Sequence, residues 1–402
     1  MTSLLASSPI LPALFWVAAV GLCYTFAGYP RLIALLARRA RAKFDKFEPH
    51  EFSLVSVVLV AHNEEARIVQ RLENLFAGDF PKKQIEILVV SDGSTDATVA
   101  RVESFAHPAV HLIKQPARIG KAGCLNLGVE KARGEIIVFA DARQRFSAST
   151  IRELATGFSD SKIGAVSGSL EIEAATSGVG AGVDAYWRLE KALRNAESRF
   201  DSCIGCTGAV YAIRAALFQP IPMDTILDDV LIPMQIALRG FRVVFNPAAI
   251  AFDPQSLEPV REIVRKQRTL AGNFQLLVRH PRWLLPWRNR LWWQLLSHKY
   301  MRLAAPLLLL VALIANSGLL GTPFYFFTFL VQCLFYVIAM AGLILSPMKN
   351  RLLSAPSAFL FLNLMVLRGL WYFLTNQAKA GWQAGQGMET HGGAVDPVIR
   401  RA

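Results

Sequence analysis

The chain has 402 residues, enough for one large domain or two ordinary ones. Its hydrophobic content of 53% is too high for a soluble protein of this length, so membrane-spanning segments are expected. The formal net charge of +13 fits either a nucleic acid or an anionic membrane surface as partner. The basic residues gather beside the apolar segments and no nucleic-acid-binding motif accompanies them, so membrane lipids are the expected partner and nucleic acid is not.

The first apolar segment, residues 10–29, contains no charged residue and is about long enough to cross the hydrocarbon core of a membrane. No Lys or Arg precedes it, which is unlike a cleavable signal peptide. Basic residues follow it instead: Arg31, Arg38, Arg39, Arg41, Lys43 and Lys46. We therefore predict a transmembrane helix within residues 1–37, with the N-terminus outside and the next segment in the cytoplasm.

The next part of the chain, residues 50–278, has the pattern of an α/β domain. Four apolar runs rich in β-branched residues are typical of buried parallel strands: residues 54–61, 85–91, 110–114 and 135–140. Helical patterns lie between them, one carrying Ile68, Leu72 and Leu75 and another at residues 121–132. Strands that alternate with helices predict a doubly wound, mostly parallel sheet.

Polar residues follow these strands at the edge where ligands bind in such sheets. His62, Asp92 and Asp141 each come directly after a strand. Asp92 could accept hydrogen bonds from a ribose or base, or could simply cap a turn. Asp141 suits Mg²⁺ or Mn²⁺ shared with diphosphate oxygens, or is only a capped strand end.

Three further groups could carry chemistry. Lys121 lies in a basic, glycine-containing loop that opens a helix, where it could neutralise phosphate or be solvated. Asp228 and Asp229 repel one another, so one could have the raised pKa of a general base, although acids also favour helix starts for their dipole. Arg265 and Arg268 precede the membrane and could clamp a diphosphate or contact anionic lipid.

The cysteines indicate neither a disulfide framework nor a zinc site. Cys203 and Cys206 form one CxxC pair, and no second pair accompanies it. Reduced cysteines in a cytoplasmic domain are the expected state.

The C-terminal part alternates interfacial and apolar patterns. Residues 279–302 mix Trp with Arg and Lys, as in an amphipathic segment lying among lipid headgroups. Transmembrane helices are predicted within residues 303–375: two spans at 303–320 and 324–345, and a shorter run at 354–367. Arg368 follows this last run, which is either a span with a snorkelling arginine or a re-entrant piece. A polar tail, residues 376–402, ends the chain.

Taken in order, these motifs resemble the membrane-embedded branch of the family 2 glycosyltransferases, which have the GT-A fold. That branch includes cellulose, hyaluronan and poly-N-acetylglucosamine synthases and ceramide glucosyltransferases. The resemblance runs from about residue 56 to residue 273. The matching stretches are VVLVAHNEE, VVSDGSTD, GKAGCLNLG, VFADA, CTGAVYAIR, LDDVLIPMQIALRGFRV and RKQRTLAGN.

The resemblance implies roles for the residues at these positions. The donor nucleotide would be bound by Ala61, Asn63, Glu64, Asp92, Lys121 and Arg143. The sugar and acceptor pocket would be shaped by Gly205, Cys206, Thr207 and Gly208. Asp229, with Asp228 beside it, would be the catalytic base, Asp141 the metal ligand, and Arg265 with Arg268 the diphosphate clamp.

Two motifs depart from the family pattern. The family's DxD is Asp141-Ala142-Arg143 here, so a cation replaces the second acid and could pair with phosphate in place of part of the metal. The family's QxxRW is Arg265-Lys266-Gln267-Arg268-Thr269, which loses the Gln and the Trp. The first change puts dependence on Mg²⁺ or Mn²⁺ in question, and the second weakens the case for a processive polymerase.

The function these patterns favour is an inverting glycosyltransferase of the cell inner membrane, with its catalytic domain in the cytoplasm. It would move a sugar from a nucleotide sugar, expected to be a UDP-sugar, to a polysaccharide or lipid-linked acceptor. The alternative is a catalytically inactive nucleotide-binding scaffold of a membrane polysaccharide-export complex, with envelope proteins as partners.

Overall fold

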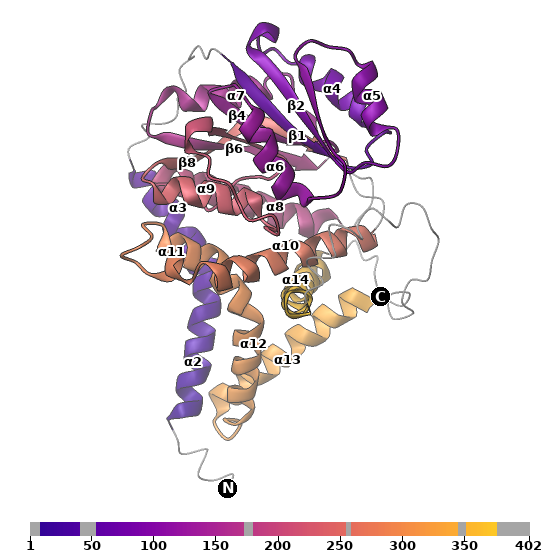
Figure 1. Ribbon diagram of the computed structural model, residues 1–402. Helices are drawn as coiled ribbons and strands as arrows, with labels where there is room; N and C mark the ends of the chain where they lie inside the picture. The colour runs from indigo at the N-terminus through magenta and orange to yellow at the C-terminus, as the bar shows by residue number, and fades with distance from the viewer. Residues whose placement is uncertain (1–8, 41–53, 173–179, 255–258, 345–350, 376–402) are drawn as a thin grey trace.

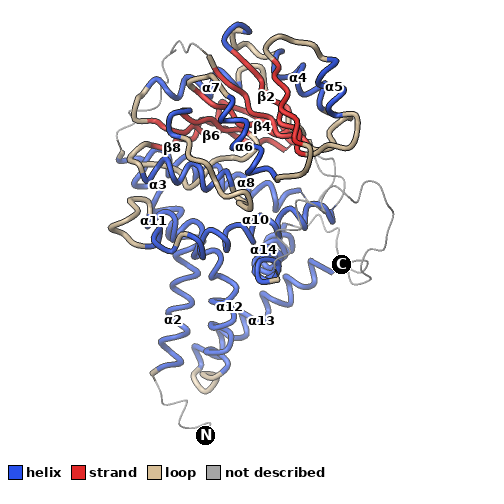
Figure 2. Tube along the Cα trace, viewed as in Figure 1, coloured by secondary structure: helices blue, strands red, loops and turns tan. Residues whose placement is uncertain are grey.

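The computed structural model describes residues 9–40, 54–172, 180–254, 259–344 and 351–375. An α/β domain sits at one end of a group of long helices, which includes the N-terminal helix (Figure 1). All strands lie in the α/β domain, and the opposite end of the molecule is helical (Figure 2). The polar tail predicted at residues 376–402 lies outside the described residues.

One eight-stranded sheet forms the centre of the domain. Its strands are β1 (Val55–Ala61), β2 (Ile85–Asp92), β3 (Val110–Gln115), β4 (Ile136–Asp141), β5 (Arg145–Phe146), β6 (Ile163–Ile172), β7 (Val210–Arg214) and β8 (Arg242–Asp253). Their order is β3-β2-β1-β4-β7-β6-β8-β5. The predicted mostly parallel, doubly wound sheet is confirmed, and β1 to β4 are its four predicted strands. Antiparallel pairs at β7 and β5 complete the sheet.

The order of the strands places a crevice at one point of the sheet edge. β1 pairs in parallel with β2 on one side and with β4 on the other. The chain runs outward from β1 through β2 to β3 and then returns to β4, so its winding direction reverses there. Ligands bind at such reversals, beyond the carboxyl ends of the strands. His62 and Asp141, at the ends of β1 and β4, lie at this point.

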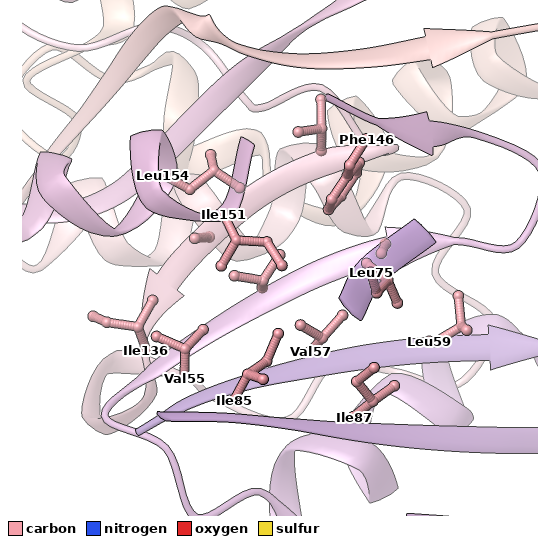
Figure 3. Close-up of a cluster of buried hydrophobic side chains, with 14 of the residues drawn as sticks. Val55, Val57, Leu59, Leu75, Ile85, Ile87, Ile136, Phe146, Ile151 and Leu154 are labelled. Atoms are coloured by element: carbon pink, nitrogen blue, oxygen red, sulfur yellow. The ribbon is translucent and has the colours of Figure 1, made fainter. Parts of the chain in front are cut away.

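Helices cover both faces of the sheet. The helices of the domain are α4 (Ile68–Phe76), α5 (Thr98–Ser104), α6 (Gly120–Lys131), α7 (Thr150–Thr156), α8 (Gly180–Phe200), α9 (Asp228–Leu238) and α10 (Pro259–Arg279). Successive strand residues point to opposite faces. Val55, Val57 and Leu59 of β1 accordingly pack with α4 and α7 in the core shown in Figure 3, whereas Val58 packs with α6 and α9.

The second core extends beyond the sheet into the segment predicted to lie among lipid headgroups. Trp283, Leu291, Leu295 and Tyr300 belong to the same buried cluster as Val58. Trp283 is 7% exposed, whereas Trp287 is 75% exposed. The segment therefore packs on the α/β domain through one set of apolar side chains, a contact that the Trp and Arg pattern does not reveal.

Within the described residues, four helical stretches are long and apolar enough to cross a membrane. They are Ile10–Arg39, which contains α2 (Ile10–Cys23) and α3 (Tyr29–Arg39); Trp292–Ser317, which contains α11 (Trp292–Leu295) and α12 (Met301–Ser317); α13 (Pro323–Ile344); and Ala355–Leu374 within α14 (Arg351–Leu374). A π-helical turn joins the two α-helices in each of the first two stretches. The second stretch begins at Trp292 rather than at residue 303.

The fourth stretch is longer than the sequence pattern indicates. α14 continues past Arg368 to Leu374, because a single arginine near a helix end costs little when its charge can reach a polar surface. α14 packs along α10, with Lys266 over the ring of Phe361 and Leu270 against Gly369. The fourth segment is therefore a complete helix that packs against the α/β domain, and not a short apolar piece.

Gly128 of α6 tests the packing between helix and sheet. A Cβ there would lie 2.5 Å from Cγ1 of Val58, a stiff, buried β-branched side chain. Gly128→Ala should gain about 0.5–1 kcal/mol of helix propensity but lose ~1–3 kcal/mol to overpacking. We expect a lower thermal unfolding midpoint in detergent. Gly123→Ala, in the same helix, is the control, because its Cβ would approach no atom closer than Cδ1 of Ile119 at 3.1 Å. Equal midpoints for the two variants would contradict this account.

Candidate active site

A buried ammonium group brings three elements together at the sheet edge. Nζ of Lys121, in the first turn of α6, lies 3.1 Å from Oδ1 of Asp141 and 3.6 Å from Oδ2 of Asp228. Burial would lower the pKa of Lys121, but the charges of Asp141, Asp228 and Asp229 outweigh burial and raise it. Lys121 is therefore a permanent cation that holds two carboxylates from β4 and α9 in one site.

Asp229 lies next to this group, enclosed by the loop before β7. Its carbonyl oxygen accepts a hydrogen bond of 2.7 Å from the backbone N–H of Cys206. A Cβ at Gly208 would lie 2.9 Å from Oδ2 of Asp229, so only glycine lets the loop approach the carboxylate so closely. Gly205 has a φ of +78°, which favours glycine as well. The structure thus brings the predicted pocket loop, residues 205–208, to the predicted base.

The surroundings of Asp229 make it more basic than an ordinary carboxylate. Burial and the negative charge of Asp228 raise its pKa to about 6, and Lys121, Lys299 and Arg194 limit the rise. At neutral pH the carboxylate is then ionised, yet it accepts a proton far more readily than an exposed aspartate does. This is the property required of a general base.

The ends of β1 and β2 lie side by side and are joined by hydrogen bonds. Asn63, with a φ of +54°, accepts a 2.9 Å bond from the N–H of Thr95 through Oδ1, and its own N–H donates to Oγ of Ser94. The N–H of Glu64 donates to Oγ1 of Thr98 at 2.8 Å. Ala61 is buried at the end of β1. These predicted nucleotide-binding residues therefore lie in one ordered loop pair.

Asp92, unlike Asn63 and Glu64, is fully buried and contacts the start of α6. It is 0% exposed, and its carboxylate accepts hydrogen bonds from the N–H groups of Ile119 at 2.7 Å and Gly120 at 3.2 Å. In this structure Asp92 holds the first turn of α6 and thereby places Lys121. Its contact with a nucleoside stays a prediction.

Arg143 and Arg265 meet at a carboxylate that the sequence analysis did not single out. Arg143 binds Asp253 through two hydrogen bonds, of 2.8 and 2.6 Å, and Nη1 of Arg265 lies 3.3 Å from Oδ2 of the same residue. Asp253 is the last residue of the apolar strand β8, as Asp141 is of β4, and this repeated pattern was the available signal. Arg268 lies farther along α10, where its charge interacts with Tyr372 of α14.

Thr207 of the pocket loop is fixed by a second missed residue, Arg194 of α8. Nη1 of Arg194 donates to Oγ1 of Thr207 at 2.8 Å, and this hydroxyl donates to the carbonyl oxygen of Gly168 at 2.8 Å. The backbone N–H of Thr207 donates to Oγ of Ser167. No motif in the sequence around Arg194 indicates this contact.

Asp141 is the one predicted metal ligand. Among the residues that the structure describes, no cluster of three or more His, Cys, Asp or Glu side chains could hold a metal ion. Mg²⁺ needs no such cluster when it shares one carboxylate with donor phosphates and waters. The Asp141 side chain is 37% exposed, and Nε of Arg71 fixes its carbonyl oxygen at 3.1 Å. The residues present therefore fit a metal ion that arrives with a diphosphate.

Comparison with known proteins identifies the domain. Residues 56–219 match the family described as glycosyl transferase family 2, so this part of the chain is a family 2 glycosyltransferase domain. A probable glycosyltransferase, YdaM of Bacillus subtilis, is 26% identical over 219 residues, which are 51% of this chain and 51% of YdaM. A poly-beta-1,6-N-acetyl-D-glucosamine synthase of Staphylococcus aureus is 25% identical over 264 residues, 61% of this chain and 58% of the synthase.

A third relative is more similar over a shorter stretch. The dolichyl-phosphate beta-glucosyltransferase ALG5C of Trichomonas vaginalis is 36% identical over 104 residues, which are 24% of this chain and 31% of ALG5C. The chain thus spans less than two thirds of the length of each of these relatives.

A solved structure shares the fold over most of the chain. The mannosyltransferase PcManGT from Pyrobaculum calidifontis, determined with GDP-Man and Mn²⁺, superposes with a TM-score of 0.66 at 22% identity. The match covers 90% of this chain and 99% of PcManGT. The predicted GT-A fold is confirmed.

The raised pKa of Asp229 predicts a pH-dependent cost to stability. In the unfolded chain this carboxyl ionises near pH 4, but in the folded protein only near pH 6. Burial of Asp229 therefore costs no stability below the unfolded pKa. The free energy of unfolding falls by roughly 3 kcal/mol as the pH rises from about 4 through 6. Asp229→Asn carries no charge, so it should unfold at a higher temperature than the wild type at pH 7.5, with a smaller difference at pH 5.

The control for this measurement is Asp224→Asn, which removes a surface carboxylate paired with Arg279. We expect that Asp224→Asn does not raise the unfolding temperature comparably at pH 7.5. A midpoint for Asp229→Asn equal to that of the wild type at both pH values would show that ionised Asp229 is not costly to bury.

Proposed function

We propose that this chain transfers a sugar from a nucleotide-sugar donor to a hydroxyl group of a glycan or lipid-linked acceptor, with inversion at the anomeric carbon. The observation that carries the proposal is Asp229: a carboxylate with a pKa of about 6, enclosed by the loop at Gly208 and one residue from the pair of Lys121 and Asp228. It is a base positioned beside a cationic site at the ligand-binding edge of the sheet.

The donor diphosphate would lie between the start of α6 and the two arginines. Lys121 opens α6, whose N-terminal backbone favours negative charge. Arg143 and Arg265 both contact the carboxylate of Asp253, so two guanidinium groups lie close together there. A Mg²⁺ or Mn²⁺ ion held by Asp141 would supply further neutralisation of the diphosphate. These groups stabilise the charge that develops on the leaving nucleoside diphosphate.

The acceptor would approach Asp229 from the side of the pocket loop. Asp229 takes the proton of the acceptor hydroxyl while the oxygen forms its bond to the anomeric carbon, and the bond to the diphosphate breaks on the opposite face. Configuration is thereby inverted, so an α-linked donor gives a β-linked product. Asp228, bound by Lys121, keeps the pKa of Asp229 raised through its charge.

The long helices support an acceptor that stays close to a membrane. α10 and α14 pack together beneath the domain, and the part of the chain that the structure describes has four helical stretches long and apolar enough to span a bilayer. Two relatives carry names that mention a polysaccharide product and a dolichyl phosphate. We place the domain on the cytoplasmic side of the inner membrane, since basic residues follow the first helix, and expect a UDP-sugar as the donor.

The second candidate is an inactive nucleotide-binding scaffold of a polysaccharide-export complex. The replacement of the second DxD acid by Arg143 favours it. The arrangement of Lys121, Asp141 and Asp229 favours catalysis instead, because simple nucleotide binding does not need a carboxylate with a raised pKa. The purified, detergent-solubilised protein would be supplied with a panel of nucleotide sugars, with and without Mg²⁺ or Mn²⁺. Nucleotide release plus a glycosylated product by mass spectrometry supports transfer; tight nucleoside diphosphate binding without release supports the scaffold.

Asp229→Asn separates the base from donor binding. Loss of a general base typically costs 10²–10⁴-fold in rate, so we expect transfer to fall by at least about 100-fold. The affinity for the nucleoside diphosphate, measured by calorimetry, should stay within about twofold, since Asp229 does not contact the donor phosphates in this scheme. Asp224→Asn should keep full activity. Retained transfer in Asp229→Asn, or lost donor binding, would refute Asp229 as the base.

Arg143→Asp combined with Asp253→Asn tests the role of the cation in the DxD motif. The double variant restores a second acid near Asp141 and removes the carboxylate that would repel it. We expect the ratio of transfer rates with and without Mg²⁺ to rise at least about tenfold above that of the wild type, because Mg²⁺ favours sites with one or two carboxylates and phosphates. Asp253→Asn alone is the control. An unchanged ratio would exclude Arg143 as a partial substitute for metal.

A further inference from the structure

A buried ionic cluster joins the catalytic domain to two of the long helices. Its acidic members, Glu190 and Glu197 of α8, are 5% and 0% exposed. His298, 1% exposed, lies between them in the helical stretch that begins at Trp292. Its Nδ1 is 2.9 Å from Glu197 and its Nε2 is 3.1 Å from Glu190. Charges that are buried this deeply are tolerated only when they are paired.

The first long helix belongs to the same cluster. The hydroxyl of Tyr29, in α3, donates to Oε1 of Glu197 at 2.6 Å. On the other side of the imidazole, Nη1 of Arg302 donates to Oε2 of Glu190 at 2.9 Å. Burial would raise the pKa of Glu190, but the charges of His298, Arg302 and Arg194 hold it well below its ordinary value. Glu190 is therefore a stable anion, and the side chains of His298, Arg302 and Arg194 surround it.

From Glu190 the contacts continue to the active site. Nε of Arg194 lies 3.3 Å from Oε1 of Glu190, and its Nη1 donates to Oγ1 of Thr207 at 2.8 Å. Thr207 precedes Gly208, where an added Cβ would lie only 2.9 Å from Oδ2 of Asp229. Arg194 has few alternatives to this orientation, because its guanidinium is held from both ends. The two helices thus connect to the pocket loop through a series of short polar contacts.

We propose that His298 is a positioning residue of the transfer reaction: it fixes Glu190, which holds Arg194 against Thr207 and so keeps the pocket loop in place beside Asp229. The inference rests on the proposed function, since it takes Asp229 to be the base. The long helices then support the active site directly, in addition to any role as a membrane anchor.

Kinetics of the full-length protein in detergent test the proposal. A shift of a base by about 1 Å can cost on the order of 100-fold, so kcat should fall about 10–100-fold in His298→Gln and in Arg194→Met. The donor KM should stay within about twofold, because the donor contacts are elsewhere. Tyr24→Phe is the matched control: Tyr24 hydrogen-bonds Ser297 and Trp293 between the same two helices without contacting Glu190.

Two kinetic outcomes would overturn the proposal. One is a comparable loss of kcat in Tyr24→Phe, which would mean that any weakening of helix packing has this effect. The other is a His298→Gln protein whose kcat is unchanged, with or without a change in donor KM.

Cys206 reports on the loop without any sugar transfer. It is 1% exposed beside Thr207, and burial raises the pKa of its thiol well above the ordinary value, so it reacts slowly while the loop is closed. Maleimide labelling, mapped by mass spectrometry, should be about tenfold faster in His298→Gln and Arg194→Met than in wild type and Tyr24→Phe. Equal labelling in all four proteins overturns the positioning role. If the labelling rates differ as expected but the wild-type protein transfers no sugar, the proposed function is overturned, whereas the contact between His298 and the pocket loop is supported.

Discussion

The ammonium group of Lys121 is the interaction on which the arrangement of the site depends. It lies within 3.6 Å of carboxylates from β4 and α9, which are elements far apart in the chain. Without this cation, Asp141, Asp228 and Asp229 would be three negative charges crowded at a largely buried edge, and their repulsion would oppose folding. Asp92 places Lys121 by holding the N–H groups of Ile119 and Gly120. Asp92 at the end of β2 therefore fixes the start of α6, α6 places Lys121, and Lys121 holds Asp141 and Asp228 together.

Much of this arrangement follows from local sequence. Four apolar strands, each followed by a turn or helix, define the parallel half of the sheet, and their carboxyl ends bring His62, Asp92 and Asp141 to one edge. The adjacent acids at 228 and 229 fall at a helix start, as expected. These features could be predicted because each depends on residues close together in the chain and on the fixed geometry of parallel crossovers.

Contacts between distant segments could not be predicted in the same way. Arg143 and Asp253 form an ion pair although they are far apart in the chain, and the sequence around neither residue indicates its partner. Trp283 looks like a headgroup-layer residue by composition but is buried against the sheet core. The fourth apolar helix continues past Arg368 and packs on α10, a tertiary contact that hydropathy alone does not predict. In each case the structural role of the residue depends on the distant segment that it contacts, and not on its own type or its neighbours in sequence.

The same reasoning changes the meaning of the altered DxD motif. Taken alone, an arginine in place of the second acid suggests a damaged metal site. In the fold, Arg143 lies against Asp253, and Arg265 of α10 joins the same carboxylate. Arg143 thus replaces an acid of the family motif and has a buried acid, Asp253, as its partner. The Asp253 side chain is 3% exposed and holds the guanidinium groups of Arg143 and Arg265 close together. Guanidinium groups bind phosphate oxygens with defined geometry. In the proposed function, these two guanidinium groups would therefore neutralise part of the diphosphate charge that a second metal-binding acid would otherwise serve to neutralise.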